Sequence, residues 1–236
     1  MVIATLLPAC SDDPYKKNDA NPMKNFSYDK EEGDYFTMIE EDLKSLHINP
    51  RDHHFQEFPI KYYLHPMEPG WQKIAQAAID DFADYFPMQN VDSRDKADLT
   101  IEISDIETIQ EKFPGIPDDG VSGVGGLIQI NVTNPLSFIK NKIAKPPQTK
   151  GIVMLLPHAF KQPIISKAII MHELCHALGV SAHSNDPYDL MYENTNSNHE
   201  INSNLITVNG ITQTLDEANS LSYRDLNTLW MLYNKW

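Results

Sequence analysis

The chain reads HELCHALGVSAH from His172 to His183, and Met191 follows eight residues later. On a helix, side chains four positions apart lie on one face, so His172 and His176 can present two imidazole nitrogens to one metal ion. Glycine adopts a positive φ at little cost, so Gly179 can end the helix and turn the chain back under the metal. We therefore expect His172, His176 and His183 to be the metal ligands.

The position of Glu173 indicates that this metal site is catalytic. Glu173 stands one position along the helix from His172, where its carboxylate is turned away from a direct bond and can act as a general base on a water beside the metal. Three protein ligands leave a fourth position for that water, whereas structural zinc sites are closed. The pattern predicts a single catalytic Zn²⁺ and peptide-bond hydrolysis with Glu173 as the catalytic residue.

The same stretch resembles the metzincin zinc metallopeptidases, and within them it is similar to the matrixins. The spacing H-E-x-x-H-x-x-G-x-x-H with a downstream methionine turn is the metzincin signature. Ser184 after the third histidine and the run Leu190-Met191-Tyr192 are similar to the matrixin pattern. The resemblance implies that Met191 forms a hydrophobic floor beneath the zinc. It does not assign Tyr192 to the metal, because metzincins with a tyrosine ligand place it two residues after the methionine.

The resemblance also implies a fold. Residues 221–233 are similar to the last matrixin helix. We therefore expect an α+β protein, a metzincin-type zinc-peptidase domain with a twisted mixed sheet, an active-site helix, a C-terminal helix and two lobes that flank a cleft. In this family an edge strand takes up the peptide substrate as an added antiparallel strand.

The resemblance also bears on two further metal sites. Residues 105–150 contain no histidine, so we predict no second, structural zinc. The glycine-rich residues 119–126 faintly resemble the family's calcium loop. An ordinary turn is the preferred interpretation there, and calcium remains the alternative.

The composition limits which classes of protein and which partners are expected. A length of 236 residues with 41% hydrophobic residues suits one domain plus a tail. The formal net charge of −14 would repel a phosphate backbone, so we expect no nucleic-acid partner. A peptide or protein substrate and a monomeric chain are expected.

The N-terminus suggests a location. The run Leu6-Leu7-Pro8-Ala9-Cys10 resembles a bacterial lipobox, so residues 1–9 are interpreted as a truncated lipoprotein signal segment, with coincidence as the alternative. The resemblance implies a bacterial cell-envelope or extracellular protein that is lipid-anchored at Cys10. Membrane contact is expected only through that anchor. Cys175 is interpreted as a small buried apolar side chain.

Residues 10–52 are expected to be separate from the catalytic domain, which is assigned to residues 53–236. The polar residues up to about Gly33 indicate a flexible linker. Between about Asp34 and His47 the apolar residues recur at helical spacing, which predicts one amphipathic helix. Simple docking of this helix on the domain is preferred over a role in a latency-conferring pro-segment.

The catalytic domain contains alternating strand and helix patterns. Strands are expected at residues 60–64, 99–103, 126–132 and 151–156, with a loop between the second and third. Helices are expected at residues 71–82, from near Ile164 through the HELCH motif, and from a capping box of Ser222 and Asp225 to Tyr233. Residues 193–214 indicate a loop with His199 at its surface. Whether 126–132 or 151–156 forms the sheet edge stays open.

Two rival functions remain at this point. The first is a non-catalytic surface lipoprotein that keeps the metzincin fold for binding, although every residue of the catalytic motif is present. The second is a zinc hydrolase that acts on a non-protein amide, such as a cell-wall component.

Overall fold

The computed structural model describes residues 19–130, 148–160, 163–192, 200–202, 205–208, 211–214 and 220–235. The predictions for Cys10 and His199 lie outside these residues. In the part of the chain that is described, no helix is both long and apolar enough to cross a membrane.

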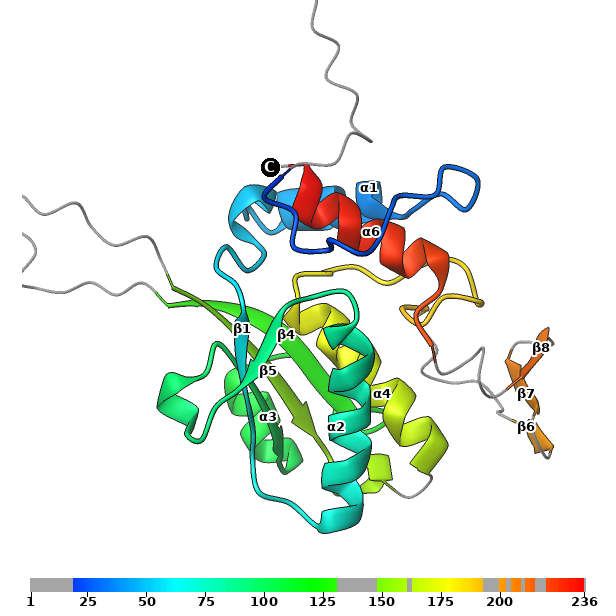
Figure 1. Ribbon diagram of the computed structural model, residues 1–236. Coiled ribbons are helices and arrows are strands. Elements are labelled where there is room, and N and C mark those ends of the chain that lie inside the picture. The colour runs from blue at the N-terminus through cyan, green and yellow to red at the C-terminus, as the bar shows by residue number, and fades with distance from the viewer. Residues whose placement is uncertain are drawn as a thin grey trace, which may run out of the picture.

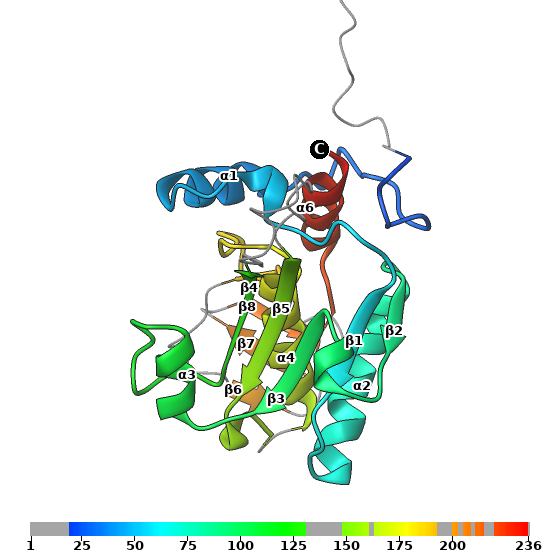
Figure 2. The same cartoon turned by 90° about the vertical axis from the view of Figure 1, so that its left-hand side faces the viewer.

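The centre of the fold is a five-stranded mixed sheet in the order β2-β1-β3-β5-β4 (Figures 1 and 2). The strands are β1 Ile60–Leu64, β2 Met88–Asn90, β3 Leu99–Ile103, β4 Gly123–Ile130 and β5 Gln148–Leu155. β1, β2, β3 and β5 run parallel to one another, whereas β4 pairs antiparallel with β5. β2 and β4 therefore lie at the two edges of the sheet, so of the two strands between which the sequence left the choice open, β4 is the one at an edge.

Helices cover both faces of this sheet. α2 (Pro69–Ala83) and α4 (Pro163–Ala177) pack against each other on one face, and α3 (Ile106–Lys112) packs on the other (Figures 1 and 2). Successive strand residues point to opposite faces. In β5 the side chain of Met154 accordingly joins Ile109 of α3, while that of Val153 joins the main core with α2 and α4.

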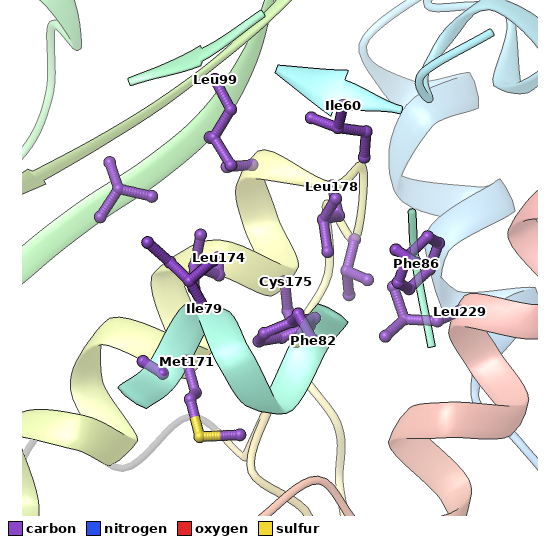
Figure 3. Packing of buried hydrophobic residues seen from close by; sticks show 14 of the residues in the cluster. Ile60, Ile79, Phe82, Phe86, Leu99, Met171, Leu174, Cys175, Leu178 and Leu229 are labelled. Atoms are coloured by element: carbon purple, nitrogen blue, oxygen red, sulfur yellow. The ribbon is translucent and has the colours of Figure 1, made fainter. Parts of the chain in front are cut away.

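The main core joins the sheet to the helices (Figure 3). It contains Ile60 and Leu99 from the sheet, Ile79 and Phe82 from α2, Leu174 and Cys175 from α4, Leu178 directly after α4, and Leu229 from α6 (Tyr223–Asn234). Each of these side chains is at most 1% exposed. The prediction that Cys175 is a buried apolar side chain is confirmed.

Glycines let α4 lie against the sheet backbone. A Cβ atom on Gly125 of β4 would stand 1.9 Å from the backbone oxygen of Glu173, a separation that no side chain tolerates. A Cβ atom on Gly151 of β5 would stand 3.0 Å from the backbone oxygen of Ala177. The HELCH segment is therefore held directly on the edge of the sheet.

The segment before the sheet packs on the C-terminal helix. α1 (Phe36–Ser45) is the predicted amphipathic helix, and it contacts α6 at one end of the sheet (Figures 1 and 2). Upstream of α1, Met23 is 0% and Phe26 7% exposed. The prediction of a flexible linker is therefore wrong for residues 19–33, because these apolar side chains enter the core among polar neighbours.

Other elements match or depart from the expected pattern. The predicted strands at 60–64 and 99–103 and the closing helix are present, and Ser222 and Asp225 form the predicted capping box. The loop expected between 103 and 126 contains α3, and short 3-10 helices occur at Pro50–Asp52, Arg94–Lys96 and Pro157–Phe160.

The prediction of a loop at 193–214 is wrong for the residues of this segment that the structure describes. β6 (Glu200–Asn202), β7 (Leu205–Val208) and β8 (Ile211–Thr214) form a three-stranded antiparallel sheet. These strands have three, four and four residues, at or below the lower limit of the four to eight residues on which a periodic pattern depends. The α+β class is confirmed, with a mixed sheet.

Candidate metal centre

Three histidines meet where α4 ends. His172 and His176 lie one turn apart on α4, and Gly179 has the predicted positive φ of +113° beyond its C-terminal end. The N–H of Val180 donates to the carbonyl of Cys175 at 3.0 Å, which closes the turn. The chain then brings His183 back, so that its Nε2 lies 3.2 Å from the Nε2 of His176 and 3.2 Å from that of His172.

These distances fit a metal ion. Zinc binds imidazole nitrogens at about 2.0–2.1 Å in tetrahedral geometry, which places two such nitrogens about 3.3 Å apart. The two separations of 3.2 Å from the Nε2 of His183 are close to this value. Imidazole ligands suit Zn²⁺ and also copper, iron and nickel. The donor set therefore fits one zinc ion.

Backbone carbonyls orient two of the rings. Nδ1 of His172 lies 2.9 Å from the carbonyl oxygen of Leu190, and Nδ1 of His176 lies 2.6 Å from that of Val180. A carbonyl only accepts hydrogen bonds, so each Nδ1 carries the proton and each Nε2 keeps a free lone pair. This tautomer is the one that a metal at Nε2 requires.

Burial keeps these imidazoles neutral. Desolvation lowers the pKa of His172 to about 4 and that of His176 to about 3, and the neighbouring imidazoles add to the effect. A neutral imidazole is the form that ligates metals. Protons therefore compete weakly for these two ligands at neutral pH.

Glu173 lies between α4 and the edge strand. Its side chain is buried, at 9% exposure, and the backbone N–H of Gly125 hydrogen-bonds its carboxylate. Its Cγ lies 3.2 Å from where a Cβ on Gly123 would stand, so it rests against β4. Burial raises the pKa of Glu173 to about 7, and the Gly125 N–H opposes this rise. A general base is most effective with a pKa near the working pH.

The raised pKa predicts a pH-dependent stability difference in the metal-free protein. Between pH 4.5 and 7 the folded chain binds more protons at Glu173 than the unfolded chain. Glu173 therefore lowers the free energy of unfolding progressively as the pH rises through this range. We expect Glu173→Gln to unfold like the wild type near pH 4.5 and to be more stable above pH 7 by up to about 3 kcal/mol.

Urea unfolding with chelator at pH 5 and pH 8 checks this expectation. The histidine contributions are common to both proteins and cancel in the comparison. Equal stability of the two proteins at pH 8 would contradict the raised pKa of the buried Glu173 carboxylate.

The Met191 turn, residues 189–192, lies next to the histidines. Met191 is 0% exposed, and its carbonyl accepts from the N–H of Ser184, the residue after His183, at 2.8 Å. Leu190 supplies the carbonyl that orients His172. The backbone of this turn therefore contacts His172 directly and the residue that follows His183. That Met191 forms the floor of a zinc site stays a prediction.

Asp225 of α6 holds the Met191 turn. Its Oδ2 accepts from the Leu190 N–H at 2.8 Å, and its Oδ1 accepts from the Met191 N–H at 3.4 Å. Burial raises the pKa of Asp225 to about 6, and the charge of Asp189 adds to this rise. The sequence indicated Asp225 only as a helix cap. Its second contact could not be predicted, because it joins residues far apart in the chain.

The loop after His183 is tied to the start of α6. Ser184 Oγ donates to Asp189, and Ser222 Oγ donates to the same carboxylate at 2.7 Å. Arg224 pairs with Asp186 at 2.8 Å. These contacts fix the chain that carries the third histidine.

Other predicted metal positions remain expectations. Among the described residues, the three histidines are the group whose ligand atoms lie close enough to share one ion. Within residues 119–126, Gly120 adopts φ +77° in a bend, and β4 begins at Gly123. Tyr192 makes a backbone bridge with Ser184.

No family model matches the chain, and no curated protein matches it. Function must therefore be argued from the geometry of the site.

Proposed function

We propose that this protein is a zinc-dependent endopeptidase of the metzincin type, with a matrixin-like site. The observation that carries the proposal is the convergence of three Nε2 atoms, with separations of 3.2 Å from His183, at the end of the helix that also carries the buried carboxylate of Glu173. Histidine clusters without a neighbouring base are equally suited to storage or structural sites. The adjacent carboxylate favours hydrolysis.

A zinc ion held by His172, His176 and His183 would acidify a water and polarise the carbonyl of the bond to be cut. Glu173 takes one proton from the attacking water and returns it to the leaving amine nitrogen. Its pKa of about 7 suits both transfers at neutral pH. Gly125 keeps the carboxylate in place through its backbone N–H.

The edge strand supports an extended peptide as the substrate. β4 ends the sheet, and its Gly123 and Gly125 lie against Glu173. A peptide that paired with β4 would run its main chain past the carboxylate, and the cleaved bond would then be internal to the peptide.

In this proposal the sheet with α2 and α4 forms one lobe, and α1 with α6 forms the other. Attachment at Cys10 would place the enzyme on the bacterial cell envelope.

A cleavage profile with matched substrates tests the proposal. The zinc-loaded protein is expected to cut internal bonds in a mixed peptide library, to stop with 1,10-phenanthroline and to recover when Zn²⁺ is restored. Casein and gelatin are compared with purified peptidoglycan. Cleavage of peptidoglycan alone would favour the non-protein amide, and zinc binding without any cleavage would favour a binding protein.

A further inference from the structure

We propose that Tyr35, the residue before α1, is a positioning residue for the histidine cluster. The inference rests on the proposed function, since it concerns how the same metal site is held. Tyr35 is 3% exposed, and its hydroxyl donates to Asp225 Oδ1 at 2.7 Å. It reaches the candidate ligands through Asp225 and the Met191 turn.

The Asp225 carboxylate links Tyr35 to the Met191 turn. It accepts hydrogen bonds from the Tyr35 hydroxyl and from the backbone N–H groups of Leu190, Met191 and Ser222. Two of these donors share Asp225 Oδ1. The Tyr35 hydroxyl lies 2.7 Å from this oxygen, whereas the Met191 nitrogen lies 3.4 Å from it. Tyr35 therefore fixes the rotation of a carboxylate that is 0% exposed.

The connection continues to two of the candidate ligands. The Leu190 carbonyl accepts the Nδ1 proton of His172 at 2.9 Å, and the Met191 carbonyl accepts the N–H of Ser184 at 2.8 Å. Ser184 follows His183 directly. If Asp225 rotates, the turn loses its two anchors, and both imidazoles lose part of their orientation. Partners in such outer positions change metal affinity by about 10–100-fold when they are removed.

The rest of the N-terminal segment keeps Tyr35 in place. The side chain of Asn227 in α6 donates to the carbonyls of Asp29 at 2.7 Å and Gly33 at 2.6 Å. The Tyr35 N–H donates to Thr228 Oγ1 at 3.1 Å. Asn227 and Thr228 are both 0% exposed. The polar side of α6 is therefore covered by the backbone of Asp29, Gly33 and Tyr35, and these contacts hold Tyr35 against the helix.

A pair of tyrosine variants tests the proposal in the full chain. Tyr35→Phe removes the hydroxyl that reaches Asp225. Tyr28→Phe is the matched control, because the Tyr28 hydroxyl also donates to a carboxylate, that of Asp34 in the same segment, which is not bonded to the Met191 turn in the contacts described. Zinc affinity is measured by competition with a chromophoric chelator, and the visible spectrum of the Co²⁺-loaded protein reports ligand geometry.

We expect Tyr35→Phe to weaken zinc binding by about 10-fold or more and to change the Co²⁺ spectrum. Tyr28→Phe is expected to stay within about 2-fold of the wild type, an order-of-magnitude allowance for an independent site. Wild-type affinity and spectrum in Tyr35→Phe, or equal losses in both variants, would overturn the proposal.

A double-mutant cycle tests whether Tyr35 acts through Asp225. Asp225→Asn preserves the shape of the side chain but removes one acceptor oxygen. If the connection is as described, adding Tyr35→Phe to Asp225→Asn causes little further loss of zinc affinity. Fully additive losses would overturn it. Thermal unfolding with chelator confirms that each variant is folded.

The two proposals fail separately. A zinc-loaded wild type that cleaves no peptide would refute the endopeptidase and leave the affinity comparison intact. A wild type that binds neither zinc nor Co²⁺ would overturn both.

Discussion

Replacing Glu173 by alanine is expected to lower kcat for peptide cleavage by about 10²–10⁴-fold, the usual contribution of a general acid–base group. Zinc affinity should remain within a few-fold of the wild type, because the carboxylate lies against Gly123 and Gly125 and is outside the cluster of ligand nitrogens. The loss should appear in kcat, since the proton transfers occur at the reacting bond.

Single-turnover cleavage of a peptide from the library, together with metal content, measures this effect. Glu111→Ala is the control, because Glu111 is an exposed acid on α3. Peptide cleavage by Glu173→Ala at the wild-type rate would show that the assigned base is wrong. Loss of zinc in the same variant would show that Glu173 is a ligand.

Replacing His183 by alanine is expected to weaken zinc binding by more than about 100-fold, beyond the range seen when outer-sphere partners are removed. His183 supplies the nitrogen that lies 3.2 Å from both other Nε2 atoms. Without it, two imidazoles on one helical turn remain, and two ligands do not enclose a zinc ion. Activity should fall with zinc occupancy.

His158→Ala provides the comparison. His158 is an exposed histidine in the 3-10 helix Pro157–Phe160 and lies outside the cluster. Equilibrium dialysis against buffered zinc is expected to give wild-type affinity for this variant. Metal-free His183→Ala should melt close to the wild type. Wild-type zinc affinity in His183→Ala would mean that the third ligand has been misassigned.

The helices at the site could be predicted because their patterns are local. The spacing of His172 and His176, the glycine at 179 and the capping box at Ser222 each depend on a few consecutive residues. The structure places the three predicted ligand histidines together. Their burial gives the physical reason for the lowered pKa values at His172 and His176.

The supports of the site could not be predicted because they join distant parts of the chain. Tyr35 and Asp225 are separated by 190 positions, yet they share a hydrogen bond. The segment around Met23 and Phe26 carries few apolar residues among many polar ones, so its composition indicated a linker. In the fold its polar groups meet buried polar groups of α6, such as Asn227.

The glycines of β4 illustrate a second limit. From sequence, residues 119–126 suggested a turn. In the structure Gly123 begins a strand, and Gly125 is required because α4 approaches to 1.9 Å of where its Cβ would stand. Such an approach between a helix and a strand has no signature in a single sequence, since glycine is also the commonest turn residue.

X-ray absorption at the zinc edge of the purified protein tests the central claim most directly. The account predicts one zinc per chain with three imidazole nitrogens and one oxygen at about 2.0–2.1 Å. A sulfur ligand near about 2.3 Å, fewer than three imidazoles, or no bound zinc after loading would contradict it.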